Sequence, residues 1–207
     1  MEDNTLTFTS ILEKCRSCQS TNLTPFLHLG SQPLPNRFLT SQQLAEKEPR
    51  YPLELFFCND CVLVQLKEAV PPIDLFDNYL YESSTSPIFR QHFKELTIYI
   101  SRFCHPQSLV VDIGSNDGVL LKPLTDRRIE AIGIEPAKNL HNIAKAKGLQ
   151  SLNFYLGDEV VDLIGKHTIS VVTACNVFAH IATIHSVVEW VKDLLTPEGV
   201  FIVEVQY

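Results

Sequence analysis

The clearest structural signal in this sequence is the segment Leu109-Val110-Val111-Asp112-Ile113-Gly114-Ser115-Asn116-Asp117-Gly118. Its first five residues are almost continuously apolar, which is typical of a strand buried on both faces of a parallel sheet. Two glycines follow, where a tight turn leads into a helix and the backbone lies open to a ligand. The segment therefore predicts a strand-loop-helix unit with a binding loop at the carboxyl end of the strand.

The chain beyond this segment repeats the same order of strand and helix. Apolar runs predict further strands at residues 131–135, 152–155, 169–175 and 200–205. Between them we expect helices, one opened by Pro136 and closed by Gly148 and another from residue 182 to 195. Continuous apolar strands separated by helices indicate an α/β fold, here a Rossmann-like parallel sheet of about five strands with helices on both faces.

A further helix is expected before the first of these strands. Ser86 and Pro87 supply an N-cap and a proline at the first helical position. An apolar stripe at helical spacing follows, formed by Phe89, Phe93, Leu96, Ile100 and Phe103. We assign this helix to a connecting region at residues 71–106, between a small first domain at 1–70 and the sheet domain at 107–207.

The glycine loop and the second strand together suggest a nucleoside cofactor. Glu135 is expected at the end of the second strand, where an acid can accept both ribose hydroxyls. The loop lacks the Gly-x-Gly-x-x-Gly pattern that seats a dinucleotide pyrophosphate. We therefore predict S-adenosylmethionine, whose amino acid tail suits a carboxylate such as Asp112. NAD, or a tight turn without any ligand, are the alternatives. The predicted cofactor-binding residues are Asp112, Gly114, Asn116, Gly118, Glu135 and, after the fourth strand, Asn176.

Four cysteines form two Cys-x-x-Cys pairs, Cys15 with Cys18 and Cys58 with Cys61. Two such pairs can complete a tetrahedral four-sulfur zinc site, and a site without an open position is structural rather than catalytic. Residues 19–57 are more than a compact zinc ribbon needs, so we expect an insertion that includes the proline-rich residues 32–36. The alternatives are free thiols or a redox-active pair, but neither pair follows the strand of a βαβ unit.

The composition limits which classes of binding partner and which cellular compartment are expected. The net charge of −7 and the pI near 5.5 argue against a nucleic-acid partner. No apolar stretch approaches the roughly 18 residues that a membrane span needs, and the first residues do not look like a secretory signal. We therefore expect a cytoplasmic protein with no membrane partner, in which paired thiols indicate a metal before a disulfide.

Together these motifs resemble the sugar C-methyltransferases that act on nucleotide-linked keto-deoxysugars. The matching pieces run through nearly the whole chain in order: Cys15-x-x-Cys18, Leu29-Gly30-x-Gln32-Pro33-Leu34, Cys58-x-x-Cys61 with Leu63-Val64-Gln65-Leu66, Tyr79-x-Tyr81-x-Ser83-Ser84, Asp112-x-Gly114-x-Asn116-Asp117-Gly118, Glu135-Pro136, and Asn176 to His180. The resemblance implies an N-terminal zinc domain that helps to form the sugar site, a central cofactor domain and a C-terminal domain.

The resemblance also implies a reaction, in which a base removes the proton beside the sugar ketone and the enolate carbon attacks the methyl group. Tyr79 or Tyr81 would then lie at the substrate, and His180, after the fourth strand, is a further catalytic candidate. The histidine base of the family lies after the fifth strand and has no match here. Alternative functions are methylation of another small molecule or of a macromolecule, and a non-catalytic module that binds zinc and cofactor.

The apolar run at residues 200–205 would be the edge of the predicted sheet. Exposed edges of this kind invite aggregation. We therefore expect the chain to be a fragment, a truncated product, or half of an assembly in which a partner chain or a missing C-terminal domain pairs with this strand.

Overall fold

The computed structural model of the protein describes residues 10–76 and 79–206. The chain folds as two compact units, Met1–Leu80 and Tyr81–Tyr207, so the connecting region expected at residues 71–106 is divided between them. Nowhere in the described ranges is there a helix of the length and apolar character that a membrane crossing requires.

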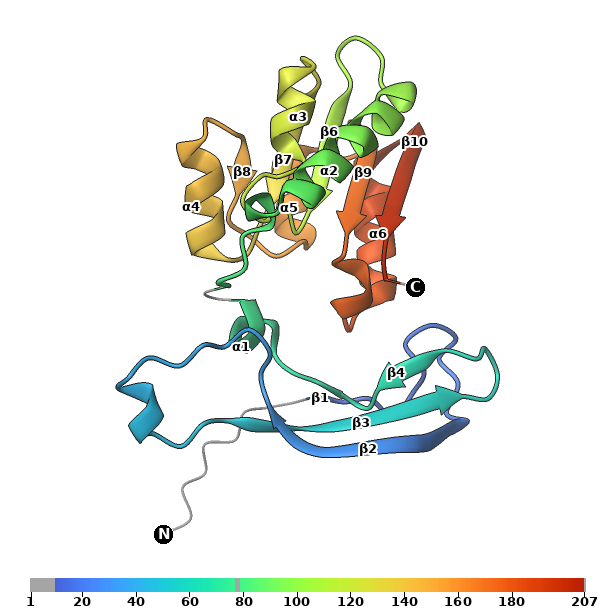
Figure 1. Ribbon diagram of the computed structural model, residues 1–207. Helices are drawn as coiled ribbons and strands as arrows, with labels where there is room; N and C mark the ends of the chain where they lie inside the picture. Colours follow the sequence, from blue (N-terminus) through green and yellow to red (C-terminus); the bar gives the residue numbers. More distant parts are fainter. Residues whose placement is uncertain (1–9, 77–78, 207) are drawn as a thin grey trace. The chain divides into compact units, whose positions relative to one another are not determined.

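The first unit is built on a three-stranded antiparallel sheet in the order β2-β3-β4 (Figure 1). Its strands are β2 (Leu23–Pro33), β3 (Arg50–Cys58) and β4 (Val64–Leu66), and β1 (Ser10–Ile11) pairs with β5 (Glu68–Ala69) in a second small sheet. The unit also contains a 3-10 helix, η1 (Gln43–Ala45), and the short helix α1 (Pro72–Phe76). Because β2 and β3 pair antiparallel with Leu23 opposite Cys58, the long insertion between the cysteine pairs folds back on itself.

The second unit is a five-stranded parallel sheet in the order β10-β9-β6-β7-β8, which confirms the predicted α/β class (Figure 1). The strands are β6 (Leu109–Ile113), β7 (Glu130–Ile134), β8 (Ser151–Leu152), β9 (Ile169–Cys175) and β10 (Leu195–Glu204). The α-helices are α2 (Pro87–Ile100), α3 (Leu121–Asp126), α4 (Lys138–Ala146), α5 (Asp158–Ile164) and α6 (Ile184–Leu194), and the 3-10 helices are η2 (Ser83–Thr85), η3 (Ser101–Phe103) and η4 (Phe178–His180).

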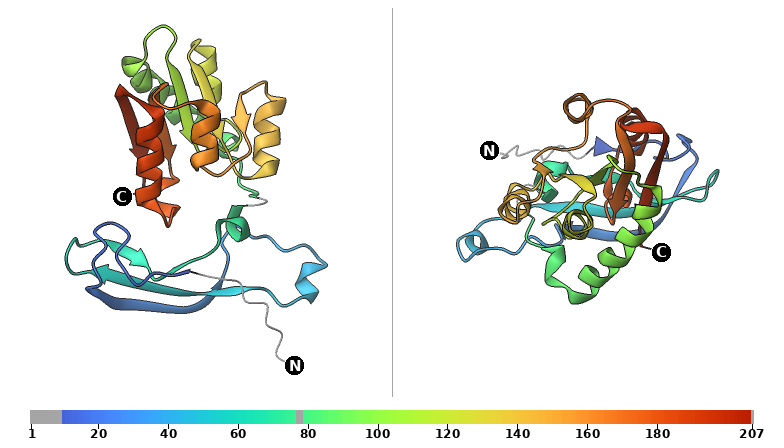
Figure 2. Two further views of the ribbon diagram at one scale, coloured as in Figure 1. Left: turned by 180° about the vertical axis from the view of Figure 1, so that it is seen from behind. Right: turned by 90° about the horizontal axis from the view of Figure 1, so that it is seen from above.

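Each face of this sheet has its own apolar core. Val110 of β6 packs with residues of α2, α3 and α4 on one face, while the adjacent Val111 packs with residues of α5 and α6 on the other. Seen from behind, α5 and α6 lie in front of the sheet (Figure 2). Successive strand residues point to opposite faces, so a strand covered on both sides is apolar throughout. This explains why Leu109–Ile113 is apolar at every position except Asp112.

Several element boundaries differ from the predicted ones. β8 ends at Leu152 rather than at residue 155, because the chain turns where the Asn153 side chain donates to the carbonyls of Glu135 (2.9 Å) and Pro136 (2.8 Å). α4 begins at Lys138 and not at Pro136, since Ala137 is still extended. Smaller differences are that α6 begins at Ile184, that β7 ends one residue before Glu135, and that β10 already starts at Leu195, with a register shift before Val200.

Candidate functional site

The glycine loop of the second unit lies at the point where the order of strands reverses. β7 and β8 lie to one side of β6, and β9 and β10 lie to the other. Helices on the two sides cover opposite faces, so the carboxyl ends of β6 and β9 mark the place where open parallel sheets bind ligands. The loop that follows β6 is anchored here, because the amide of Gly114 donates to the carbonyl of Ile134 at 2.8 Å.

Both glycines of the loop are required by their surroundings. Gly114 and Gly118 have left-handed φ angles of +66° and +83°. A Cβ on Gly114 would lie 2.4 Å from Cγ2 of Val177, and one on Gly118 would lie 2.3 Å from Cδ1 of Leu149. The glycines therefore allow the loop to pack closely against the segments that follow β9 and α4, a need that sequence alone did not show.

Two buried carboxylates, Asp112 and Glu135, lie beside this loop. Thr173 of β9 donates its hydroxyl to Oδ1 of Asp112 at 2.6 Å. Burial raises the pKa of Asp112 to about 7, only partly offset by the Thr173 hydroxyl, and the neighbouring Glu135 adds to the rise. Burial likewise raises the pKa of Glu135. Carboxyl groups held in such surroundings gain from a ligand that brings hydrogen-bond donors or positive charge.

Glu135 also accepts hydrogen bonds from two loops, the one that follows β6 and the one that follows β7. Its Oε2 accepts the amide of Asn116 at 2.8 Å, and its Oε1 accepts the amide of Ala137 at 2.8 Å. Each carboxylate oxygen has a second lone pair, which stays available for a ligand hydroxyl. The structure thus brings Asp112, Glu135 and the glycine loop together, as the sequence predicts.

Asn176 follows β9 with a left-handed φ of 58°. Its side-chain amide donates to Oε1 of Glu204 at 3.3 Å, and Gln206 donates to its Oδ1 at 2.8 Å. Glu204 also contacts α2, where Nε2 of His92 lies 2.6 Å from its Oε2. The predicted residue is therefore held by Glu204 and Gln206, and Glu204 is in turn held by His92 of α2; sequence reasoning missed all three. The only sequence signal for Glu204 was an acid within an apolar strand.

The three catalytic candidates lie in different settings. Tyr79 belongs to the first unit, where its hydroxyl accepts from Nδ2 of Asn36 at 3.2 Å. Tyr81 is the first residue of the second unit, and its carbonyl accepts from Nδ2 of Asn116 at 3.0 Å. His180 ends η4 after β9 and is exposed. Tyr81 is thus hydrogen-bonded directly to the glycine loop.

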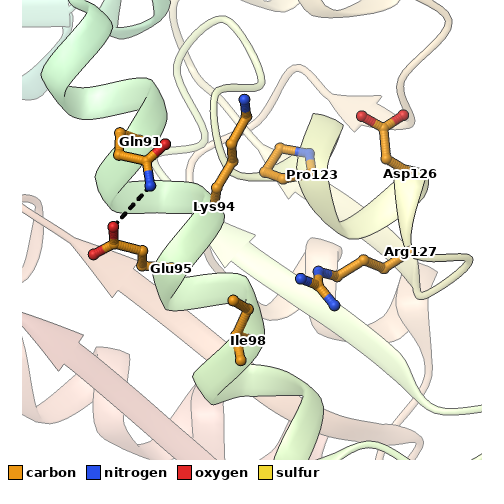
Figure 3. A pocket seen from close by; sticks show the side chains of 7 residues that line it. All are labelled: Gln91, Lys94, Glu95, Ile98, Pro123, Asp126 and Arg127. Atoms are coloured by element: carbon orange, nitrogen blue, oxygen red, sulfur yellow. Dashed lines mark hydrogen bonds between the residues drawn. The ribbon is translucent and has the colours of Figure 1, made fainter.

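A groove between α2 and α3 lies apart from these residues (Figure 3). Its lining consists of Gln91, Lys94, Glu95, Ile98, Pro123, Asp126 and Arg127. The lining has charges of both signs and contains none of the predicted site residues. We therefore assign no function to it.

The four paired cysteines meet in the first unit. Their sulfur atoms all lie within 4.8 Å of one another, and the Cys15–Cys61 and Cys18–Cys58 distances are 3.5 Å each. Zinc-bound thiolates at about 2.3 Å from the ion lie about 3.8 Å apart in a tetrahedron, so the cluster fits a four-sulfur zinc site.

The two cysteine turns have the same backbone geometry. Gln19 and Val62, which follow the second cysteine of each pair, have left-handed φ angles of 62° and 60°. Their amides donate back to the carbonyls of Cys15 (3.0 Å) and Cys58 (2.9 Å). Two equivalent turns that face each other present four sulfurs symmetrically, which neither free thiols nor a single redox pair would require.

The thiols also influence one another electrostatically. The amide of Cys61, assisted by that of Asp60 and opposed by desolvation, lowers the pKa of Cys58 to about 7. The pKa of Cys18 rises to about 12, although the Ser20 amide acts to lower it, because desolvation and the neighbouring thiols oppose a further thiolate. A cation at the centre would remove this opposition.

Polar side chains outside the sulfur cluster brace the two turns. The buried Gln65 of β4 accepts the amide of Arg16 at 2.8 Å and donates to the carbonyl of Lys14 at 3.2 Å. Asp60 in the second turn accepts from Nδ2 of Asn22 (3.0 Å) and from the hydroxyl of Ser20, both just after the first turn. In the sequence, Gln65 stands out only by its place in the apolar run Leu63-Val64-Gln65-Leu66, so its role at the cysteine turns could not be predicted.

Comparison with known proteins gives two family matches. Residues 88–207 match a family described as "Methyltransferase domain", and residues 15–76 match one described as "Putative zinc binding domain". The chain is 32% identical over 202 residues to C-methyltransferase NovU from Streptomyces niveus, a match that covers 95% of this chain and 48% of that protein. The chain thus spans about half the length of this curated relative.

Part of this chain shares its fold with a solved structure. The PH0226 protein from Pyrococcus horikoshii OT3 matches with a TM-score of 0.51 and 18% identity, over 64% of each chain. The YcgJ protein from Bacillus subtilis matches with a TM-score of 0.47 and 19% identity, over 55% of this chain and 50% of that one.

Proposed function

Because this chain belongs to the methyltransferase-domain family, we propose that its second unit binds S-adenosylmethionine for methyl transfer to carbon. We further propose that the acceptor is a small molecule, a nucleotide-linked keto-sugar, and that zinc supports the structure of the first unit. The relative named as a C-methyltransferase supports transfer to carbon. The sugar acceptor rests on the motif resemblance described above.

One observation carries the cofactor proposal: two buried carboxylates flank a glycine loop at the reversal point of the sheet. Glu135 is 5% exposed and Asp112 is 4% exposed. The loop has no Gly-x-Gly-x-x-Gly pattern for a pyrophosphate, while both acids suit a ligand with ribose hydroxyls and an ammonium group. This combination favours an adenosyl amino acid over a dinucleotide.

The residues of this chain would hold and orient the cofactor. Glu135 would accept the ribose hydroxyls through its remaining lone pairs, and Asp112 would interact with the amino acid end. When bound, S-adenosylmethionine supplies an electrophilic methyl group. Tyr79, Tyr81 and His180 remain the candidates for contact with the acceptor, and Asn176 remains a candidate for contact with the cofactor. Paired thiols that hold a metal suit a reducing compartment, so we propose a cytoplasmic location.

Calorimetric titration of this chain tests the cofactor proposal directly. We expect S-adenosylhomocysteine to bind and NADH to give no heat. Glu135→Gln should weaken binding at least about tenfold, or about 1.4 kcal/mol, since the amide replaces one accepting oxygen with a donating nitrogen. Glu130→Gln is the control, because Glu130 is exposed at the opposite end of the same strand. NADH binding without S-adenosylhomocysteine binding would refute the assignment.

The acceptor is tested separately. A 4-keto sugar nucleotide and labelled S-adenosylmethionine should yield a product with the label on carbon. Methylation of another acceptor instead would retain the enzyme class and overturn the sugar. Cofactor binding without transfer to any acceptor would favour a non-catalytic module.

A further inference from the structure

Residues 81–85, here called the strap, are hydrogen-bonded to the side chains of Asn116 and Asp117 in the glycine loop. The amide of Ser83 donates to Oδ1 of Asn116 at 2.9 Å, and Nδ2 of Asn116 donates to the carbonyl of Tyr81 at 3.0 Å. The amide of Ser84 donates to Oδ1 of Asp117 at 3.2 Å, and the Ser84 hydroxyl donates to the other oxygen. The strap is therefore attached at successive residues by two loop side chains.

The side chain of Asn116 is already used within the protein. Its Oδ1 also accepts the amide of Asp117 at 2.8 Å, and an amide oxygen has only two lone pairs. Its backbone amide donates to Oε2 of Glu135. Asn116 thus connects the strap to the carboxylate proposed to hold the ribose, and its side-chain oxygen has no further capacity for a ligand.

Asp117 is held by a charged partner from another element. Its side chain is 0% exposed, and Nζ of Lys147, just after α4, lies 2.8 Å from its Oδ2. The same Nζ donates to the Asp117 carbonyl at 2.9 Å. A buried carboxylate is tolerated only when it is paired and hydrogen-bonded, so removing Lys147 would leave a costly unpaired charge. Lys147 therefore stabilises the arrangement in which Asp117 holds the strap.

We infer that Asn116, Asp117 and Lys147 are positioning residues that make the strap a wall of the cofactor site. Cofactor binding and the order of the strap are then coupled, and with them the position of Tyr81. The physical link is continuous, because the amide that fixes Glu135 belongs to the residue that holds the strap. Coupling of this kind acts equally in both directions. The inference rests on the proposed cofactor site and reassigns the Asn116 side chain from binding the ligand to positioning the strap.

Calorimetry with S-adenosylhomocysteine on the full chain provides the first test. Lys147→Met should raise the Kd at least tenfold, while Lys147→Arg, which retains the charge, should recover most of the affinity. Lys145→Met is the matched control, because Lys145 is an exposed lysine of the adjoining helix. Melting temperatures identify a merely structural role: a lower Tm with an unchanged Kd would refute the coupling.

Hydrogen exchange provides the second test, on the strap itself. In the wild-type chain, S-adenosylhomocysteine should slow exchange at the amides of Ser83 and Ser84, and Asn116→Ala should abolish this slowing. Ser84→Ala removes one hydroxyl and serves if the larger changes prevent folding; it should weaken both binding and protection. Strap exchange that does not respond to ligand in a binding-competent wild-type chain would overturn the inference. A wild-type chain that binds no ligand would instead refute the proposed function.

Discussion

At the scale of single residues, Asp112 is a predicted site acid whose pKa is strongly raised by burial. Its pKa of about 7 in the folded chain lies above the ordinary value of 3.8. The folded state therefore retains a proton that the unfolded state releases as the pH rises above about 4. The contribution of this group to stability is complete below that pH and is lost as the pH rises through about 7.

This pH dependence of stability can be measured by comparison with Asp112→Asn. Between pH 5 and 7 the wild-type chain should lose stability relative to the variant, by at most about 1.4 kcal/mol per pH unit, and the difference should level off above pH 7. Urea unfolding followed by the fluorescence of Trp190, the one tryptophan of the sequence, measures it in the second unit. A parallel pH dependence of the two chains would show that Asp112 does not titrate in this range.

Val62 has a backbone conformation that is unfavourable for its residue type. It is a β-branched residue with a φ of 60°, and it is 70% exposed. Val62→Gly should therefore stabilise the first unit by about 1 kcal/mol, since strain is relieved and little burial is lost. Val64→Gly, in the neighbouring strand β4, should destabilise it. Thermal unfolding of the zinc-loaded chain, followed by circular dichroism, compares the two variants, and equal effects would argue against strain at Val62.

At the scale of secondary-structure elements, α2 is part of the core of the second unit. Phe93 and Ile100 pack in the same cluster as Val110 of β6, and Ile100 is fully buried. The apolar stripe correctly indicated which face of the helix is buried. It could not identify the sheet that the helix covers, because periodicity contains no information on the partner.

This packing predicts different costs for two isoleucines of the same helix. Ile100→Ala should destabilise the second unit by about 2–5 kcal/mol, because the lost methyl groups leave a cavity. Ile98→Ala should cost less than about 1 kcal/mol, since Ile98 is 47% exposed. Urea unfolding reported by Trp190 distinguishes them. Similar losses from both substitutions would contradict the assignment of α2 to this core.

At the scale of the whole molecule, the two units are stabilised by different means. The second unit has a large apolar core on each face of its sheet, whereas many apolar side chains of the first unit are exposed, including Phe26, Leu27 and Leu29. A small domain with so little buried apolar surface needs a metal or another cross-link to fold stably.

Removal of the metal should therefore affect the two units differently. A zinc chelator should release about one equivalent of zinc and melt the β-sheet signal of the first unit. The fluorescence of Trp190, held by its bond to Asp158 in the second unit, should stay unchanged. Loss of the tryptophan signal on chelation would show that the second unit also depends on the metal.

Local patterns were sufficient for the parts of this protein that depend on neighbouring residues. Continuous apolar runs that alternate with helical stripes indicated the parallel sheet. A strand covered on both faces is apolar throughout, and a helix covered on one face is apolar at helical spacing. The Cys-x-x-Cys spacing indicated each half of the sulfur cluster, since one turn holds both thiols. The short β8 and the late start of α4 were missed, because side chains of Asn153 and Glu135 bond to backbone groups there.

Folding alone decided how distant segments meet. Ser84, Asp117 and Lys147 are far apart in the chain and none forms a motif with another, yet Ser84 and Lys147 both bind the buried Asp117. Gln65 and the first cysteine turn are also distant in sequence. A polar residue in the linear chain does not reveal its partner, because a hydrogen bond depends on distances of about 3 Å that only the packed chain establishes.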